Sequence, residues 1–325
     1  MSDEVFLTGA TGFVGAHVLD RLLAGGYRVR ALVRGGAERL PARDGCTAVG
    51  GDVRDSGALV THMRGCRYLV HTAAVYSFTP RQRAEVLDVN VRGTRSLLEA
   101  AHIAGVERAV VTSSSAAVGP ARNGHPATEE QWADAHSGSS AYHRSKVLQE
   151  RAALRARVSV TTVLPTAPVG PGDHRPTPTG RMVLDVMRGR MWGTLGGGMN
   201  VVSVEDAAAA HVLALERGEP GERYIAGGVN LSLAELWRVI AVAAGRRAPR
   251  LRIPYAIALA AGGVDEARAR LTGAEPRVPL EGVRMGHVRM YVSSDKAQRE
   301  LGYRPTPIVP AIERAVAWYR THGYA

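Results

Sequence analysis

The chain has 325 residues, of which 45% are hydrophobic and only 5% are aromatic. This length and apolar fraction suffice for one large or two ordinary domains with a buried core. So few aromatic side chains argue against a base-stacking surface for nucleic acid. The formal net charge is +11, but the basic residues are scattered instead of forming a tail. That distribution indicates a solvated surface attractive to anionic small molecules and does not favour a nucleic-acid partner.

Cysteine usage and apolar runs narrow the class further. Cys46 and Cys66 show no spacing typical of a disulfide framework or a metal site, so reduced thiols, no metal and a cytoplasmic location are expected. The opening MSDEVFL lacks the charged and apolar regions of a signal peptide. The longest apolar run, from Ile253, is too short to span a bilayer, and we expect it to form a buried helix.

Short apolar runs alternate with helical stretches through the first half of the chain. Strands are expected at 4–8, 27–33, 46–52, 67–74, 107–114 and 158–165. Helices are expected at 13–26, from about 56, at 87–105 and at 140–156. Because strand-helix-strand crossovers are right-handed, this alternation predicts an α/β fold of the Rossmann type, a doubly wound parallel sheet.

The regular alternation ends at Pro165, where a stretch rich in proline and glycine begins. Helices are then expected at 181–189, 205–218, 232–245 and 310–324, with strands near 200–204 and 222–228. We therefore expect residues 1–165 to form a dinucleotide-binding domain. Residues 166–325 are expected to form mainly a smaller substrate-binding α/β lid, with some segments returning to the sheet.

The stretch TGATGFVG, Thr8 to Gly15, follows the first strand and opens the first helix. In a pyrophosphate-binding turn, Gly9 would permit the tight turn, Gly12 the close approach of the phosphate, and Gly15 the packing of helix on strand. The spacing alone does not distinguish this turn from any tight strand-to-helix connection. Its position between a strand and a helix favours the dinucleotide interpretation.

Arg34, after the second predicted strand, and Asp52, at the end of the third, bear on how a dinucleotide would bind. Arg34 stands where such folds commonly place an acid for the ribose, and an arginine there can pair with a 2′-phosphate. It favours NADP(H) over NAD(H), although a surface arginine is the plain alternative. Asp52 is placed either to hydrogen-bond the adenine or to cap the helix that starts near Ser56.

The strongest chemical pattern is SAYHRSK, which puts Tyr142 and Lys146 four residues apart on one face of a helix. A tyrosine pKa is ordinarily about 10, and a nearby ammonium can lower it by roughly one to three units. Tyr142 could then act as an acid or base. A core tyrosine beside a solvated lysine is the alternative, but the chain has only one other lysine, Lys296, among 41 basic residues.

Further polar groups are expected near this pair. Hydroxyls at a strand end, from Thr112 to Ser115, could donate to a substrate carbonyl, or merely cap the strand. Asn90 lies within a predicted helix, where asparagine is a poor helix former, so a buried polar role near the site is expected.

Taken together, Tyr-x-x-x-Lys, the upstream serines and the glycine turn resemble the extended branch of the short-chain dehydrogenase/reductase superfamily, the NAD-dependent epimerase/dehydratase family. Within it, the chain looks most similar to the group of hopanoid-associated sugar epimerases and dihydroflavonol-4-reductase-like enzymes. The resemblance implies Ser114, Tyr142 and Lys146 as catalytic residues. It implies cofactor contacts from Gly9, Thr11, Gly12, Phe13, Val14, Arg34, Asp52, Val53, Thr72, Ala73, Ala74, Asn90, Thr112, Tyr142, Lys146 and Pro165.

Three functions are compatible with these residues. The first is an NADP-dependent oxidoreductase acting on a carbonyl or alcohol carbon of a small molecule. The second is an NAD-dependent epimerase or dehydratase of a nucleotide sugar. Many such enzymes have arginine at the position of Leu164, and the leucine argues against nucleotide-sugar binding. The third, a dinucleotide-sensing regulator, would not need the proton-transfer residues. The resemblance also implies a homodimer formed by the helices of Asn90 and Tyr142. Substrate contacts are expected from Tyr76, Ser115, Thr166, Arg175, Thr179 and Arg181.

Overall fold

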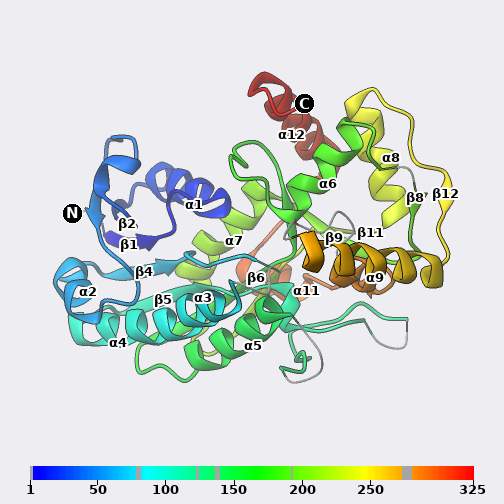
Figure 1. Cartoon of the computed structure of the whole chain (residues 1–325). Helices are drawn as coiled ribbons and strands as arrows, with labels where there is room; N and C mark the ends of the chain where they lie inside the picture. Colours follow the sequence, from blue (N-terminus) through cyan, green and yellow to red (C-terminus); the bar gives the residue numbers. More distant parts are fainter. Residues whose placement is uncertain (1–2, 78–81, 122–123, 136–139, 192, 273–279) are drawn as a thin grey trace.

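The computed structural model describes residues 3–77, 82–121, 124–135, 140–191, 193–272 and 280–325. Seven parallel strands form the large sheet in the order β10-β6-β5-β4-β1-β2-β3 (Figure 1). They are β1 (Glu4–Thr8), β2 (Arg28–Val33), β3 (Cys46–Gly50), β4 (Tyr68–His71), β5 (Arg108–Thr112), β6 (Ser159–Pro165) and β10 (Arg223–Ala226). The predicted α/β fold with a doubly wound parallel sheet is confirmed.

Helices cover both faces of this sheet because successive side chains of each strand point to opposite faces. Val5 and Leu7 pack with α1 (Phe13–Ala24) and α7 (Val204–Arg217). Phe6 faces the other way, toward α2 (Ser56–Met63), α4 (Thr94–Ala104) and α5 (Ala141–Ala153). Each face therefore has its own apolar core.

The helix expected at 87–105 is composite. It consists of α3 (Arg83–Leu87), a π-helical turn (Asp88–Gly93) and α4. The π turn contains the buried Asn90. Single π-helical turns within α-helices often occur at functional sites.

Most elements after β6 form a second, smaller α/β unit. β7 (Ala167–Val169), β9 (Gly198–Ser203), β11 (Val229–Ser232) and β13 (Arg289–Met290) make a small mixed sheet, and β8 (Gly193–Thr194) pairs with β12 (Leu251–Arg252). A third apolar cluster joins this sheet to α6 (Pro178–Met187), α8 (Leu233–Ala244) and α12 (Ile308–Thr321). Between them, α7 and β10 return to the large sheet.

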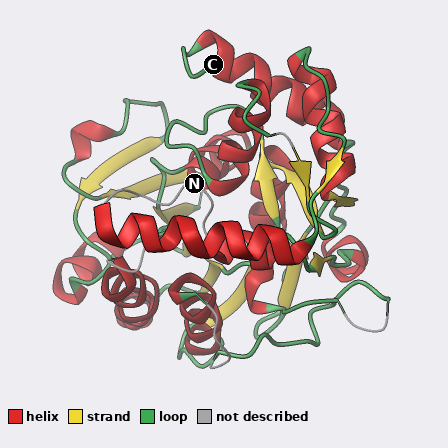
Figure 2. Ribbon diagram, turned by 45° about the vertical axis from the view of Figure 1, so that its right-hand side comes forward, coloured by secondary structure: helices red, strands yellow, loops and turns green. Residues whose placement is uncertain are grey.

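The expected burial of the apolar run from Ile253 is wrong. It forms α9 (Tyr255–Thr272), which is followed by α10 (Leu280–Met285) and α11 (Asp295–Leu301) and lies across the outside of the molecule (Figure 2). Ile257, Val264 and Leu271 are 61%, 73% and 89% exposed. Among the residues of this helix whose burial is described, the buried ones are small, such as Ala258. Apolar residues occur all around this helix, so the sequence pattern could not show which side packs.

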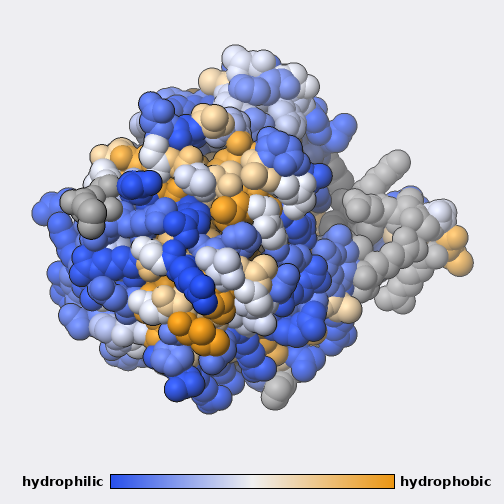
Figure 3. Space-filling model, turned by 90° about the vertical axis from the view of Figure 1, so that its left-hand side faces the viewer, coloured by the Kyte–Doolittle hydropathy of each residue, from blue (hydrophilic) through white to orange (hydrophobic). Residues whose placement is uncertain are grey.

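Two properties of the surface bear on partners. Seen from the side of β2 and α2, the surface is mainly hydrophilic, interrupted by groups of hydrophobic residues (Figure 3). Within the described ranges, no helix is long and apolar enough to cross a membrane.

Candidate active site

The turn between β1 and α1 has the geometry of an anion-binding site. Gly9 has φ +83°, and a Cβ built there would lie 2.6 Å from the Ala73 nitrogen. A Cβ on Gly15 would collide with the Gly9 carbonyl oxygen. Gly12 begins α1 and supplies no side chain to cap it, so backbone N–H groups of the first helical turn point outward. The turn therefore fits the pyrophosphate of a dinucleotide.

The segment after β4 lies directly beneath this turn. The Thr72 hydroxyl donates to the Thr8 carbonyl over 2.8 Å, and the Ala73 nitrogen donates to the Thr8 hydroxyl over 3.3 Å. Thr72 is thus used by the fold itself, whereas Ala74 stays exposed at the rim. The remaining predicted residues of the turn are Thr11, which is exposed, and Phe13 and Val14, which are half-buried.

Arg34 lies at the end of β2 with 64% of its side chain exposed, and its guanidinium is 3.9 Å from Glu85. It remains accessible to a ligand. Both carboxylate oxygens of Asp52 accept hydrogen bonds from Arg54, at 2.7 and 2.8 Å, which hold the Asp52 pKa below its usual value. It does not cap α2, since Asp55 does so by accepting from the Ala58 nitrogen over 3.3 Å. Val53, beside it, is buried.

Tyr142 enters the site from the first turn of α5, which the Ser140 hydroxyl caps. Its hydroxyl is hydrogen-bonded to the side chain of Ser114, and its ring packs against Tyr76 with the centroids 4.2 Å apart. Burial raises the pKa of Tyr142 to about 12, although the bond with Ser114 acts in the opposite direction. Ser115 follows in a short 3₁₀ turn. The structure thus brings Ser114, Tyr142 and Tyr76 together.

Lys146 is buried one helical turn after Tyr142, with only 2% of the residue exposed. Its ammonium donates to the Thr112 carbonyl at 3.0 Å and to the Gln149 side-chain oxygen at 2.9 Å. It lies 5.9 Å from the centre of the Tyr142 ring. The expectation that this ammonium lowers the Tyr142 pKa is therefore not met. The ammonium is hydrogen-bonded to two other oxygens, and burial has the largest effect on the Tyr142 pKa. Burial lowers the pKa of Lys146 itself to about 8.

Asn90 is fully buried and clamps the loop beneath the site. Its side chain accepts from the Val75 nitrogen at 2.7 Å and donates to the Val75 carbonyl and to Ser145, both at 3.0 Å. The amide is committed to these partners, so Asn90 supports the loop that carries Ala74 and Tyr76. This is a polar role near the site, as the sequence predicted, exerted through the backbone of the loop.

The residues expected to touch substrate lie in two places. Tyr76 packs on Tyr142, and Thr166 follows Pro165 at the end of β6 with a buried hydroxyl oxygen that has no hydrogen-bond partner among the described residues. Three others lie in the smaller α/β unit, Arg175 before α6 and Thr179 and Arg181 within its first turn. Leu164 is buried in the core with Ile225, where it contributes to packing.

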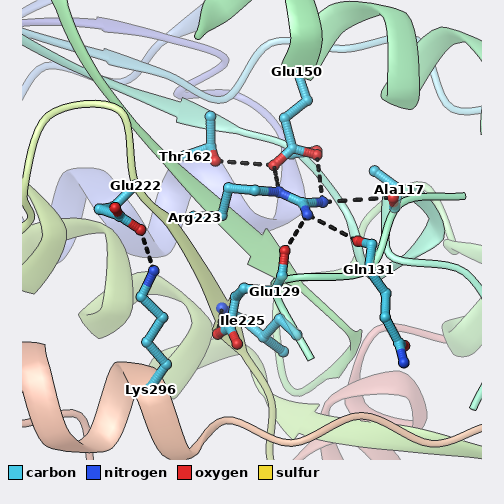
Figure 4. A network of polar contacts seen from close by, with 10 residues as sticks. Ala117, Glu129, Gln131, Glu150, Thr162, Glu222, Arg223, Ile225 and Lys296 are labelled. Atoms are coloured by element: carbon cyan, nitrogen blue, oxygen red, sulfur yellow. Dashed lines mark hydrogen bonds and ion pairs between the residues drawn. The ribbon is translucent and has the colours of Figure 1, made fainter. Parts of the chain in front are cut away.

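A buried charge network lies at the far end of α5 (Figure 4). Glu150 pairs with Arg223, and Arg223 also donates to backbone carbonyls of Glu129, Gln131 and Ala117. Sequence reasoning missed this network and the contacts of Gln149 and His211, whose Nε2 meets the Thr112 hydroxyl at 2.7 Å. Gln149 stands three residues after Lys146 and could have been found by helical spacing. His211 is 99 positions from Thr112 and had no such signal.

The sequence of the chain is similar to those of known proteins over most of its length. The pattern of the NAD dependent epimerase/dehydratase family matches residues 5–227. The chain belongs to this family. It is 39% identical to a Synechocystis sp. protein named as a provisional dihydroflavonol 4-reductase, over 100% of this chain and 96% of the relative. It is 36% identical to sterol demethylase protein B of Methylococcus capsulatus, over 98% of each.

A solved structure extends the likeness to three dimensions. The nucleoside-diphosphate-sugar epimerase PA4631 from Pseudomonas aeruginosa superposes with a TM-score of 0.80 at 26% identity, over 100% of this chain and 99% of that one. Members of this family are extended short-chain oxidoreductases, epimerases and dehydratases, so the protein is an enzyme of this type with a nicotinamide dinucleotide cofactor.

Proposed function

We propose that the protein is an NADP-dependent reductase that converts a carbonyl group of a small molecule into an alcohol, with Tyr142 as the proton donor. One observation supports this direction above the others, the 39% identity over 100% of this chain to a relative named as a provisional dihydroflavonol 4-reductase. The Tyr142 hydroxyl is hydrogen-bonded to Ser114 and burial raises its pKa to about 12. At neutral pH the phenol therefore carries a proton that it can donate to a carbonyl oxygen.

In this mechanism Ser114 holds the substrate oxygen and Tyr142 gives it a proton as negative charge develops there. The nicotinamide, when bound, supplies the hydride. Lys146 is positioned to hold the ribose and to keep positive charge near Tyr142 after the proton has left. Gly9, Gly12 and the start of α1 would hold the pyrophosphate. Ala73, which follows β4, and Thr112 and Pro165, which end β5 and β6, would contact the rest of the dinucleotide.

Arg34 supports NADP(H) as the preferred form of the cofactor. Its exposed guanidinium at the end of β2 is free to meet a 2′-phosphate, since its contact with Glu85 is long at 3.9 Å and solvent-exposed. NAD(H) is the alternative.

The substrate-binding part of the proposal rests on the segments after Pro165. We assign residues 1–165 to dinucleotide binding and most of 166–325 to substrate binding, with Tyr76, Ser115, Thr166, Arg175, Thr179 and Arg181 as contacts. The names of the two sequence relatives, a dihydroflavonol reductase and a sterol demethylase protein, support a non-sugar substrate. A cytoplasmic homodimer formed through α4 and α5 completes the proposal.

A second candidate is an NAD-dependent epimerase or dehydratase acting on a nucleotide sugar. It is favoured by the likeness to PA4631, whose title names it a nucleoside-diphosphate-sugar epimerase. Such an enzyme regenerates its cofactor within each cycle and commonly keeps it bound, whereas a reductase exchanges it.

The two candidates are separated by what the purified protein holds. The dinucleotide released on denaturation is identified by mass spectrometry, and NADPH consumption is followed with a panel of ketones. Little bound dinucleotide together with consumption of NADPH supports the reductase. Stoichiometric NAD without net consumption of either reduced dinucleotide would establish the epimerase or dehydratase instead.

A further inference from the structure

Lys146 is a buried cation without an acidic partner. Its nearest acid along α5, Glu150, is already committed, because its two oxygens accept from Arg223 at 2.9 and 3.2 Å and from Thr162 and Ser113 at 2.9 Å each. In the part of the chain that the structure describes, no carboxylate pairs with the Lys146 ammonium. It is held by two neutral oxygens, those of the Thr112 backbone and the Gln149 side chain.

The orientation of the Gln149 amide follows from counting hydrogen atoms around Thr94. The Thr94 hydroxyl donates its one hydrogen to the Asn90 carbonyl at 2.7 Å. Its oxygen can then only accept, so the group that approaches it from Gln149, at 3.0 Å, must be the amide nitrogen. The amide oxygen of Gln149 is consequently turned toward Lys146.

The tautomer of His71, at the other end of this hydrogen-bond network, is fixed in the same way. His71 Nε2, 2.9 Å from the Thr94 oxygen, must also donate, which leaves Nδ1 to accept from the Thr8 hydroxyl at 2.7 Å. Thr8, His71, Thr94 and Gln149 are all fully buried. Every member therefore has one allowed role, and the network fixes Gln149 as an acceptor for Lys146.

The charges that face Lys146 come from three elements. His71 on β4 and His211 on α7 would repel an ammonium, but burial lowers their pKa values to about 3 and about 4 and keeps both neutral. On α5 itself, Glu150 favours the charged lysine and Tyr142 is neutral while its phenol is protonated. Because Glu150 is paired with Arg223, the two neutral oxygens that contact the ammonium share with Glu150 in keeping the lysine charged.

We propose that Gln149 is a positioning residue that holds the Lys146 ammonium against the Thr112 carbonyl and keeps it protonated in the interior. An amide oxygen does this without adding a negative charge to the site, whereas a carboxylate would form an ion pair with the ammonium. The third donor of the ammonium is then left for a ligand. This role is the same for a reductase and for an epimerase, so it does not depend on the direction of the reaction.

The composition of the chain permits a direct test, because Lys146 and Lys296 are its only lysines. Protein labelled with carbon-13 in lysine gives two side-chain signals, and the variant Lys296→Arg assigns them. The pH at which each signal shifts is its pKa. In the wild type, Lys146 should titrate near pH 8, while Lys296 on the surface, paired with Glu222, serves as the internal reference.

Replacing Gln149 by leucine or by methionine removes the acceptor, and methionine is also close to glutamine in length. Each should lower the Lys146 pKa by about one unit, since a hydrogen bond to a charged group is lost, and leave Lys296 unchanged. Gln149→Glu keeps an acceptor, so the Lys146 pKa should equal or exceed that of the wild type.

A Lys146 pKa that falls in the leucine and methionine variants but not in the glutamate variant separates this role from a merely structural one, which would lower it in all three. An unchanged Lys146 pKa in both the leucine and the methionine variants overturns the proposal. So does a fall in the glutamate variant. Because no substrate or dinucleotide is added, neither result depends on the proposed function.

Discussion

Glu150 and Arg223 form an ion pair inside the protein, with Arg223 Nε 2.9 Å from Glu150 Oε1 and side chains 0% and 7% exposed. The pair joins the helix of Tyr142 and Lys146 to strand β10, and Arg223 also binds carbonyls of the loops that follow Ser114 (Figure 4). Trp132 lies over the guanidinium at 3.7 Å. The ion pair therefore anchors the catalytic helix to two loops distant in sequence.

Glu150→Gln should destabilise the fold, because it leaves the Arg223 charge buried without compensation. Breaking a buried pair in this way costs about 3–5 kcal/mol. Urea unfolding measures the change in the free energy of unfolding. The matched control is Glu222→Gln, which breaks the surface pair with Lys296 and should cost about 1 kcal/mol or less. Equal costs for the two variants would contradict the anchoring role.

Gly15→Ala should weaken dinucleotide binding, because its Cβ would collide with the Gly9 carbonyl oxygen and force the turn open. NADPH and NADH affinity, measured by fluorescence titration, should fall by about tenfold or more. Gly282→Ala is the control, since a Cβ there meets nothing within 4 Å. Retained affinity in Gly15→Ala would mean that the turn does not hold the pyrophosphate.

Arg34→Gln should weaken NADPH binding selectively. A charge-assisted hydrogen bond is worth about 1.5–3 kcal/mol, so NADPH affinity should fall by roughly tenfold or more while NADH affinity stays the same. Isothermal titration with each dinucleotide measures both. If the wild type binds NADPH and NADH equally well, Arg34 does not select the cofactor.

Acid should destabilise the protein through His71 and His211. Their pKa values in the folded state, about 3 and about 4, lie below the ordinary value of 6.5. Below pH 6.5 these histidines are therefore protonated in the unfolded chain but remain neutral in the folded chain. Stability is then full above about pH 6.5 and falls as the pH drops toward 4, by up to about 1.4 kcal/mol per pH unit for each histidine.

Urea unfolding at pH 7, 6 and 5 measures this slope. His71→Asn should have a shallower slope than the wild type, whatever its absolute stability. The control is His125→Asn at an exposed position, which should leave the slope unchanged. Identical slopes in all three proteins would show that the buried imidazole is not the source.

Local patterns account for what the sequence could predict. The glycine spacing, the alternation of strands and helices, and the Tyr142–Lys146 pair each depend on neighbours a few residues apart, and the fold follows from them. The contact of Lys146 with the Thr112 carbonyl depends on how α5 packs on β5, and the partner of Glu150 lies on β10, 73 positions away. The exposed side of α9 was misjudged because a continuous apolar run does not say which face is covered.

The most direct test of the account is the turnover of Tyr142→Phe with NADPH and a ketone that the wild type reduces. The variant should bind NADPH as the wild type does, and its turnover should fall by about 10²–10⁴-fold, the contribution of a positioned proton donor. Near-normal turnover with unchanged NADPH affinity would contradict the assignment of Tyr142 as the proton donor.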